Sequence, residues 1–432
     1  MKDVILIVYT TRYRKGGDKF ELVARTLRSE KENESIQIIC NPIESKNALK
    51  EAFEKIAHSN LEIIEFHFIG HSGMYGPMFG EVAYPEQFSP HELSLLKIPF
   101  SKSARAFFHC CRSARWFAPY FANAQNVTTY GYHWYTTFSI RKDRYKRVNP
   151  WSTTSNLYCF GSPGRKSHGI LASMKKLAGK MDPETFKEFR AGVRPDRSYE
   201  KVAELYARTF SDIKVRTDEY NFIVNSLPEF TGKVLDIGCG NGALLKSLTP
   251  FIQEGVGVDV SENLLNHAKS LNFNNSKLSF KQLQGPTLPF ENDSFDVVIS
   301  LLSFRYLDWD PIMAEIERVL KKEGRLIIVD MVTAPVRTSE LLGLLRSKVK
   351  HYYNRYRYPQ FYRNLHDLVS HPDWKNMLDH NPIRSEHEMK WYLESRFPGR
   401  KVRVINIGKH SRILAFNSIN MANIKRINLT YP

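Results

Sequence analysis

The amino-acid sequence predicts an α/β protein of two domains, each built on a sheet flanked by helices. Three observations support this prediction. The chain has 432 residues, which is too long for one ordinary hydrophobic core. Its first 165 residues alternate short apolar segments with helical patterns, as parallel sheets with crossover helices do. From Val234 onward, a strand, a glycine-rich turn, a helix and a second strand follow one another, which is typical of a ligand-binding α/β unit.

The first domain is expected over residues 1–165. Helical patterns fall at about 18–28 and 45–58, and Ser45 is a suitable N-cap for the second helix. Their alternation with strands predicts a parallel sheet with helices on both faces. Five short segments have the β-branched or aromatic character of buried strands: Val4–Tyr9, Ile36–Cys40, Ile63–Ile69, Ala104–Cys110 and Val127–Tyr132.

The remainder of the chain divides into a basic connector over 166–197 and a second α/β domain over 198–432. A stretch rich in glycine, serine and proline at 160–169 ends the first domain, because such residues favour turns and loops. The connector is expected to hold one or two helices.

The composition is that of a soluble globular protein, with 42% hydrophobic and 25% charged residues. No apolar stretch approaches the ~20 residues of a membrane span. The first ten residues have the character of a strand rather than of a signal peptide, so we expect a cytoplasmic protein. The five cysteines form neither a disulfide framework nor a C-x-x-C metal pair. We therefore expect reduced thiols and no metal site.

The glycine-rich turn is the most informative motif. Gly238, Gly240 and Gly242 follow a predicted strand, and a turn without side chains lets a ligand approach the backbone near the start of a helix. Asp259 ends the next strand, where its carboxylate is placed to accept hydrogen bonds from both hydroxyls of a ribose. Asp236 precedes the first glycine and is suited to hold a cationic amine or to order the loop. These features predict a nucleotide-like ligand.

The spacing of the glycines narrows the kind of ligand. A dinucleotide fingerprint requires G-x-G-x-x-G, whereas the third glycine comes one residue early in VLDIGCGNG. This segment resembles motif I of the class I S-adenosylmethionine-dependent methyltransferases. The segments 288–300 and 324–332 resemble the small-molecule branch called type 11, and the resemblance covers roughly residues 199–335. A Rossmann-like NAD site is the alternative.

The resemblance implies a Rossmann-like domain with a seven-stranded sheet. In it, Asp236 and the three glycines hold the amino-acid end of S-adenosylmethionine, and Asp259 holds the ribose. The type 11 pattern has an acid four residues before Leu-Pro-Phe that bonds the adenine amino group. This sequence has Gln284 there, whose side-chain carbonyl can accept the same bond.

The methyl acceptor is expected beside the segment that follows the strand at 295–300. No Asp/Asn-Pro-Pro-Tyr motif occurs there, so the amino-directed nucleic-acid methylases are not matched. Arg305 and Tyr306 fall near the expected acceptor. Two roles are open for them: they position or deprotonate substrate, or they pack the end of the sheet.

The net charge of +17 is concentrated in two segments. Residues 139–200 carry 14 Lys/Arg and 6 Asp/Glu, and residues 337–365 carry 7 and 1, so both are expected to attract an anionic partner. The second segment interleaves arginine with aromatic residues. We expect it to be a lid whose aromatic residues face the methylation pocket. The alternative is stacking on single-stranded nucleic acid.

The C-terminal part of the chain is expected to complete the methyltransferase-like sheet. Two apolar segments resemble its closing strands, with a hairpin turn at 408–410 between them. The lid is then an insertion over about 336–384 that precedes these strands, which are 402–407 and 412–416.

A second candidate site lies in the first domain, at the ends of two predicted strands. His71 follows the strand at 63–69, and Cys111 follows the strand at 104–110. The ends of consecutive parallel strands open on one edge of a sheet. A thiol and an imidazole at that edge are suited to act as nucleophile and base.

This pattern resembles the caspase-like cysteine peptidase fold, with Cys111-Arg112-Ser113 at the C-R-G of the family motif. The resemblance implies that Cys111 is the nucleophile, that His71 is the general base, and that the amides of Gly73 and Cys111 line an oxyanion hole. The sequence departs from the family motif at three positions: Ser72 lies between His71 and Gly73, His109 replaces a glutamine, and Ser113 replaces a glycine.

The leading hypothesis is an S-adenosylmethionine-dependent methyltransferase that acts on a small molecule, a peptide or a protein and is fused to a caspase-like domain. Methyl transfer requires alignment of donor and acceptor and exclusion of water rather than a fixed catalytic residue. One alternative is a caspase-like cysteine peptidase, or a peptide-recognition domain, with an accessory methyltransferase. Another is an RNA methyltransferase that uses the basic segments.

Overall fold

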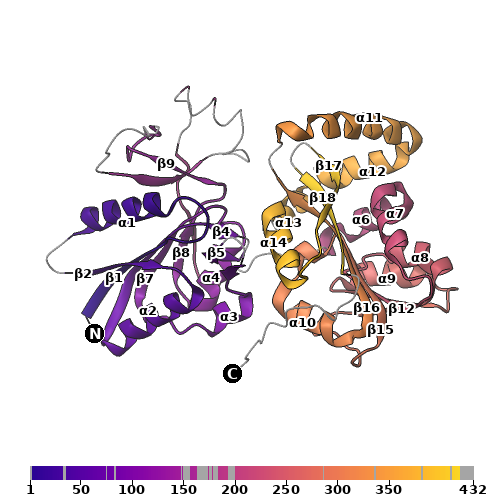
Figure 1. Cartoon of the computed structure of the whole chain (residues 1–432), viewed down its shortest axis with the longest axis horizontal. Helices are drawn as coiled ribbons and strands as arrows, with labels where there is room; N and C mark the ends of the chain where they lie inside the picture. Colours follow the sequence, from indigo (N-terminus) through magenta and orange to yellow (C-terminus); the bar gives the residue numbers. More distant parts are fainter. Residues whose placement is uncertain are drawn as a thin grey trace. The chain divides into compact units, whose positions relative to one another are not determined.

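The chain forms two compact units, Met1–Pro195 and Asp196–Pro432, and each is described by itself (Figure 1). Both units combine helices with a central sheet, as the sequence predicts. Among the described residues, no helix combines the length and apolar character required to cross a bilayer. The computed structural model describes residues 2–32, 36–73, 75–81, 84–146, 148, 156–162, 174, 178, 183–192, 200–285, 287–334, 337–380, 383–408 and 411–418.

The first unit is built on a six-stranded sheet in the order β11-β8-β7-β3-β1-β2. All neighbouring pairs are parallel except β11 with β8. The parallel sheet and the five predicted strands are therefore present. The strand bounds are β1 Lys2–Thr10, β2 Gln37–Ile43, β3 Leu61–Ile69, β7 Phe100–His109, β8 Thr128–Gly131 and β11 Lys187–Phe189.

Helices cover both faces of this sheet because side chains alternate along each strand. Alternate residues of β1 enter two different hydrophobic clusters, one shared with α2, α3 and α4 and the other with α1. Ser45 caps α2 as predicted, since its side chain accepts a hydrogen bond from the Ala48 N–H. The helices are α1 Gly17–Lys31, α2 Lys46–His58, α3 Pro90–Leu95 and α4 Phe117–Gln125.

Two small antiparallel sheets complete the described part of the first unit. One joins the segment after His71 to the following loop, and the other lies beyond Cys111 in the sequence. Their strands are β4 Ser72–Gly73, β5 Gly76–Glu81 and β6 Tyr84–Gln87, and β9 Thr136–Ser139 and β10 Tyr158–Gly161.

The edge strand β11 corrects the expected connector. Lys187–Phe189 pairs with Thr129–Gly131 of β8, so the first sheet extends beyond the predicted boundary at residue 165. The physical reason is that an edge strand has unpaired backbone groups, which a returning segment can satisfy. The predicted helices of the connector fall mostly outside the described residues.

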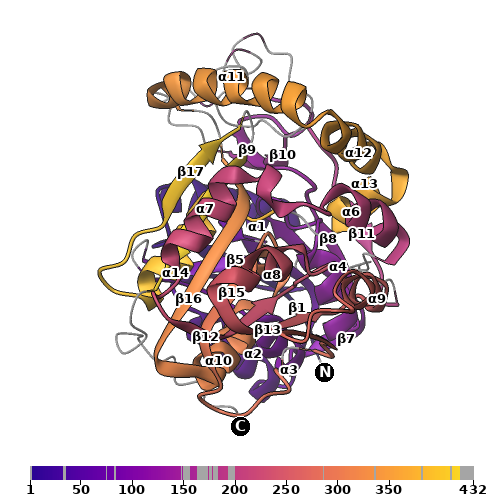
Figure 2. The same ribbon diagram turned by 90° about the vertical axis from the view of Figure 1, so that its right-hand side faces the viewer.

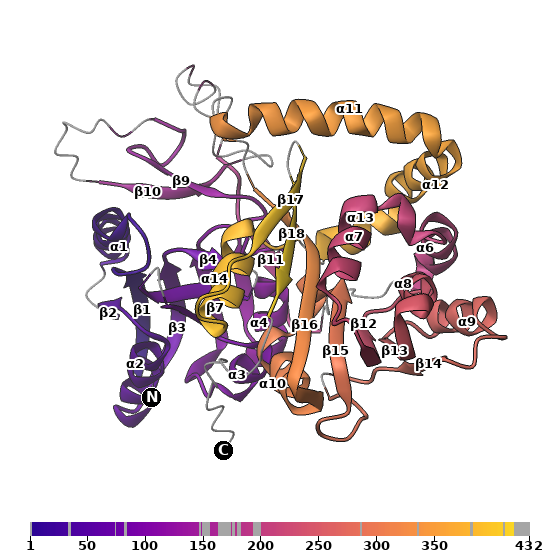
Figure 3. The same cartoon turned by 45° about the vertical axis from the view of Figure 1, so that its right-hand side comes forward.

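The second unit contains a seven-stranded sheet in the order β14-β13-β12-β15-β16-β18-β17. Strand β18 runs antiparallel to both of its neighbours, β16 and β17, and all other neighbouring pairs are parallel (Figure 3). The predicted closing strands match β17 and β18, while Lys409 and His410 of the predicted turn lie outside the described residues. The strands are β12 Thr231–Ile237, β13 Ile252–Asp259, β14 Leu278–Gln282, β15 Phe295–Leu301, β16 Leu320–Thr333, β17 Arg403–Ile407 and β18 Ser411–Asn417.

Helices of the second unit also pack on both faces of its sheet. One hydrophobic cluster includes α10 and α14, and another includes α7 and α8. The predicted helix after the glycine-rich turn is α8. The helices are α6 Ala203–Thr209, α7 Thr217–Ser226, α8 Ala243–Leu248, α9 Glu262–Leu271, α10 Trp309–Val319 and α14 Glu386–Arg396, with short 3₁₀ turns η1 Glu200–Val202, η2 Ile213–Val215, η3 Thr249–Phe251, η4 Phe304–Tyr306 and η5 Thr338–Glu340.

The insertion before the closing strands forms α11 Leu341–Arg357, α12 Pro359–Ser370 and α13 Pro372–His380 (Figure 2). Phe361 of α12 and Trp374 of α13 pack with Phe210, the residue after α6, as inward-facing aromatic residues should. In α11, by contrast, no residue is buried. The expectation that the aromatic residues face inward is therefore wrong for α11, whose side toward β17 carries Gly343 and Ser347 instead.

Candidate functional site

The glycine-rich turn joins β12 to α8 at the carboxyl end of the second sheet. Gly238, Gly240 and Gly242 have φ angles of 74°, 55° and 73°, a left-handed region that glycine enters more readily than other residues. A Cβ on Gly238 would clash with Ser303, and one on Gly242 would lie 2.7 Å from the ring of Phe280. Backbone conformation and close packing therefore both require glycine here, in addition to any approach by a ligand.

Asp259 ends β13 beside this turn. Its Oδ2 accepts a hydrogen bond from the Gly240 N–H, and its Oδ1 accepts one from the Ser261 N–H, both at 2.9 Å. Burial raises the pKa of this carboxyl, and the backbone hydrogen bonds oppose that rise. Each carboxylate oxygen retains a further lone pair, so Asp259 keeps acceptor capacity for the hydroxyls of a ribose.

Asp236 lies on β12 and is only 2% exposed. Its Oδ1 has no hydrogen-bond partner within the part of the chain that the structure describes. Burial, and then the charge of Asp259, raise the pKa of Asp236 to about 8. A buried carboxyl without a partner is energetically costly, and a cation beside it would favour the ionised form. The site therefore fits a ligand with a cationic amine.

Two residues that sequence reasoning missed connect the turn to α6. The side-chain amide of Asn241 donates hydrogen bonds to the carbonyls of Ala207 and Phe210, at 3.0 and 3.2 Å. The ring of Tyr206 lies 3.3 Å from the position of a Cβ on Gly240, and burial raises the pKa of Tyr206 to about 12. Asn241 lies within the glycine-rich motif, so the sequence could have identified it. Nothing in the sequence pattern pointed to Tyr206.

Gln284 lies two residues beyond β14, and its side chain is exposed. The preceding residue, Leu283, donates its N–H to the Asp259 carbonyl at 2.8 Å. The structure thus brings the predicted cofactor residues together at the carboxyl ends of three adjacent strands, β12, β13 and β14.

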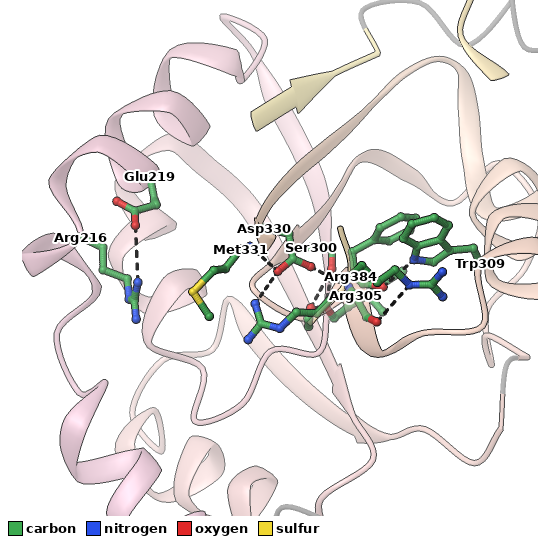
Figure 4. Close-up of polar contacts among 11 residues, drawn as sticks. Arg216, Glu219, Ser300, Arg305, Trp309, Asp330, Met331 and Arg384 are labelled. Atoms are coloured by element: carbon green, nitrogen blue, oxygen red, sulfur yellow. Dashed lines mark hydrogen bonds and ion pairs between the residues drawn. The ribbon is translucent and has the colours of Figure 1, made fainter. Parts of the chain in front are cut away.

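Arg305 and Tyr306 lie in η4, after β15 (Figure 4). The Arg305 Nη1 is 2.5 Å from Oδ1 of Asp330, and the Arg305 backbone N–H donates to Oδ2 of Asp330 at 2.6 Å. The side chains of Arg305 and Asp330 are both buried. The Arg305 guanidinium lies 4.5 Å from the centre of the Tyr306 ring. A guanidinium cannot take up a further proton, so Arg305 cannot be the group that deprotonates a substrate.

Further contacts fix η4 in place. Arg384 donates to the Arg305 carbonyl at 3.3 Å, and its guanidinium lies 3.5 Å from the centre of the Trp309 ring. Trp309 donates from Nε1 to the Phe304 carbonyl at 2.9 Å. These contacts give Arg305 a structural role, because its ion pair with Asp330 holds η4 on β16. Neither Asp330 nor Arg384 was identified from the sequence.

In the first unit, the register of the sheet brings the ends of two strands together. The last paired residues of β3 and β7 are Ile69 and His109, and His71 and Cys111 each lie two residues further along. The Ser72 hydroxyl donates a hydrogen bond to the Cys111 carbonyl, so the two loops are in direct contact.

Each of the two candidate residues of this strand-end site has a polar contact. The His71 Nε2 is 3.2 Å from the carbonyl oxygen of Lys15. A carbonyl can only accept, so a neutral His71 that makes this hydrogen bond donates it from Nε2. The Cys111 Sγ lies 3.2 Å from Oγ1 of Thr136. The caspase-like resemblance of this unit stays a prediction.

Comparison with known proteins bears on the second unit. Residues 235–328 match a family described as a methyltransferase domain. An uncharacterized methyltransferase, YcgJ of Bacillus subtilis strain 168, is 31% identical over 172 residues, which cover 38% of this chain and 62% of that protein. A demethylmenaquinone methyltransferase of Clavibacter sepedonicus is 27% identical over 142 residues, covering 32% of this chain and 58% of that protein. The chain therefore spans less than two thirds of these curated relatives.

A solved S-adenosylmethionine-dependent methyltransferase from Aquifex aeolicus aligns at 15% identity with a TM-score of 0.34, covering 50% of this chain and 98% of that one. A score of this size is too low to support a conclusion about function. The family match and the curated relatives support a methyltransferase domain with S-adenosylmethionine as its cofactor.

Proposed function

We propose that the second unit transfers the methyl group of S-adenosylmethionine to a small-molecule, peptide or protein acceptor. The observation that carries this proposal is the buried Oδ1 of Asp236, which no residue of the described ranges bonds, beside the glycine-rich turn. Asp236 would hold the cationic amine of the cofactor, Asp259 its ribose hydroxyls and Gln284 its adenine amino group. The family match over residues 235–328 supports the same assignment.

When bound, the cofactor supplies an electrophilic methyl group on its sulfonium. The protein then has to align the acceptor and exclude water. Ser303 donates from its hydroxyl to the Ile237 carbonyl at 2.6 Å, which joins the ends of β12 and β15. The Arg305–Asp330 ion pair fixes η4, and Asn241 holds α6 against the turn. These contacts position the two sides of the site without any change in protonation.

Calorimetry with S-adenosylmethionine tests the cofactor assignment. We expect micromolar affinity, about −8 kcal/mol at a Kd of ~1 μM, and binding at least about tenfold weaker in Asp259→Ala because its ribose hydrogen bonds are lost. Glu291→Ala is the matched control, since Glu291 is exposed and precedes β15 at the opposite end of the sheet. No heat with the parent protein, or unchanged affinity in Asp259→Ala, would contradict the assignment.

The acceptor class is tested by transfer of a tritiated methyl group to separate pools of small molecules, protein and RNA. We expect label in the small-molecule or protein pool and none in RNA. Label in RNA, with binding that falls log-linearly with salt, would instead establish the RNA methyltransferase alternative.

For the first unit we propose a second function, hydrolysis of a peptide bond by Cys111 and His71. The supporting observation is that both residues lie two positions beyond the paired ends of β3 and β7, in loops joined by the Ser72–Cys111 hydrogen bond. The Cys111 sulfur would attack the carbonyl carbon while its proton passes to the imidazole of His71. The leaving amine would then take that proton, and water would cleave the thioester.

Incubation with a peptide panel tests this second function. We expect Cys111→Ala to abolish cleavage, because the neighbouring thiol of Cys110 is fully buried and cannot replace it. Cys40→Ala is the control, since Cys40 lies on β2. Equal cleavage by the parent and Cys111→Ala, or no cleavage by the parent, would refute the peptidase hypothesis.

A further inference from the structure

We propose that α11 docks the second unit on an anionic lipid surface. The helix has an apolar stripe that faces away from the unit, although such residues are normally buried. No residue of α11 is buried. Seven of its large apolar or aromatic side chains are between 58% and 88% exposed: Leu341, Leu342, Leu345, Val349, Tyr352, Tyr353 and Tyr356.

The seven residues form one continuous stripe, which is called the α11 stripe below. At 3.6 residues per turn, their positions fall within an arc of about 120° around the helix axis. An arc of that width is typical of a helix face that buries against something. In α11 this face is exposed along the whole length of the helix.

The opposite side of α11 is anchored to the unit, so the stripe is not an accident of a loose helix. The Ser347 hydroxyl donates to Oδ1 of Asn406 on β17 at 3.3 Å. A Cβ on Gly343 would lie 3.0 Å from the side chain of Ile407. The ring of His351 packs edge-on against Tyr362 of α12, with centroids 5.0 Å apart. Small and polar residues thus face the unit, and the apolar residues of the stripe are exposed.

Positive charges border the α11 stripe on both sides. By helical spacing, Arg346, Lys350 and Arg357 lie along one border, and Lys348 and Arg355 lie along the other. The helix contains no acidic residue. Lys350 is paired with Asp218 at 2.5 Å, which leaves the other four as the cations that face a partner. Long basic side chains beside an apolar face can reach lipid phosphates while the apolar side chains enter the acyl boundary.

The composition of the stripe favours lipid over nucleic acid. Its first half is aliphatic, from Leu341 to Val349, and its second half holds three tyrosines. Nucleic-acid bases stack on aromatic rings, so they would leave the aliphatic half unused. A bilayer interface accommodates both halves, because leucine enters the apolar region and tyrosine lies at headgroup level. The charge borders specify an anionic surface.

Vesicle co-sedimentation of the full chain tests the proposal. The probes are phosphatidylcholine vesicles alone and vesicles with about 30% phosphatidylserine. We expect at least about tenfold stronger binding to the anionic vesicles, weakened by salt. Leu345→Glu with Val349→Glu should reduce binding at least about tenfold, because two carboxylates would enter the apolar stripe. Val369→Glu is the matched control, since Val369 is exposed on α12 outside the stripe.

Three results would overturn the proposal. The first is absence of binding to anionic vesicles, and the second is equal binding by the double variant and the parent. The third is loss of binding to single-stranded RNA, or of self-association, in the double variant while vesicle binding is unchanged. Circular dichroism melting curves of the same samples show whether each variant is folded, so the outcome is independent of the proposed methyl transfer.

Discussion

The two candidate sites occupy the same place in their sheets, at the carboxyl ends of parallel strands, but their polar groups are satisfied differently. In the first unit, His71 bonds the Lys15 carbonyl and Cys111 contacts Thr136. In the second, Asp236 is buried with an oxygen that no described residue bonds. A polar residue at a strand end is therefore weaker evidence for a ligand than a buried polar atom without a hydrogen bond. Only the unbonded atom destabilises the protein when no ligand is bound.

The largest expected effect is a loss of stability in the second unit when the Arg305–Asp330 ion pair is broken. Arg305→Ala leaves the charge of Asp330 buried without its partner, which typically costs about 3–5 kcal/mol. We expect thermal unfolding of this unit to move down by roughly 10 °C. Differential scanning calorimetry measures this change. A shift under ~2 °C would show that the ion pair does not hold η4.

A double variant sharpens this result. Arg305→Met with Asp330→Asn removes both charges and keeps an amide oxygen that can accept from the backbone. We expect most of the lost stability to return, together with binding of S-adenosylmethionine. Restored stability with lost methyl transfer would instead give Arg305 a direct role with the substrate.

Asp236→Asn tests the unfulfilled carboxyl directly. We expect S-adenosylmethionine to bind about 10–100-fold more weakly, a loss of roughly 1.4–2.8 kcal/mol, because a neutral amide replaces an ionic partner of the amine. At neutral pH the parent should release about one proton on binding, since a cation lowers the raised pKa of Asp236. Calorimetry in buffers of different ionisation enthalpy measures that proton. Its release by Asp236→Asn as well would rule out Asp236 as the source.

The same carboxyl makes the stability of the unliganded protein depend on pH. The folded pKa of Asp236, about 8, lies above its ordinary value of 3.8. Folding therefore favours the protonated form, whose contribution is complete below about pH 4 and is lost as the pH rises through 8. We expect the stability of Asp236→Asn relative to the parent to increase between about pH 5 and 8 and to level off by about pH 9. Parallel melting curves of the two proteins across this range would contradict the assignment.

A smaller effect is expected at the exposed edge of the cofactor site. Gln284→Glu restores the acid of the type 11 pattern, and a charge-assisted hydrogen bond is about twice as strong as a neutral one. We expect S-adenosylmethionine to bind about 3–10-fold more tightly. Glu291→Gln is the control, because Glu291 is exposed and precedes β15 at the opposite end of the sheet. Weaker binding by Gln284→Glu would place the adenine away from Gln284.

The smallest effect should come from the first unit. Cys111→Ser keeps a hydroxyl beside Thr136, so we expect a change in stability within about 0.5 kcal/mol. Cys110→Ser should destabilise by roughly 1–3 kcal/mol, because Cys110 is fully buried and burial raises its pKa to about 12. Chemical denaturation of both variants tests this contrast. A large loss in Cys111→Ser would make Cys111 a core residue rather than part of a site.

Much of the fold was visible in the sequence because strands and turns have local signatures. Val4–Tyr9 and Ile63–Ile69 are apolar runs of strand length, and they lie within β1 and β3. The glycines and Asp259 were predictable because a turn and the end of a strand can be recognised from residues adjacent in the sequence. The structure places them with Asp236 at one edge of the sheet, as the motif predicts.

Features that depend on distant pairing escaped the sequence analysis. Asp330 stands in an otherwise apolar strand, which signalled a buried partner without identifying Arg305. Tyr206 precedes the motif by about thirty residues, and no periodic pattern links it to Gly240. The outward orientation of Tyr352 and Tyr356 could not be predicted either. An amphipathic helix has the same sequence pattern whether its apolar face points toward the protein or toward solvent.

Helix α6 is shared between the cofactor turn and the insertion. The carbonyls of Ala207 in α6 and of Phe210 just after it accept hydrogen bonds from Asn241. The ring of Phe210 also packs with Phe361 of α12. Thermodynamic reciprocity requires that a ligand which orders α6 from one side favours order on the other side by the same free energy. If a ligand at the strand ends orders α6, packing of the insertion against α6 must in turn strengthen binding of that ligand.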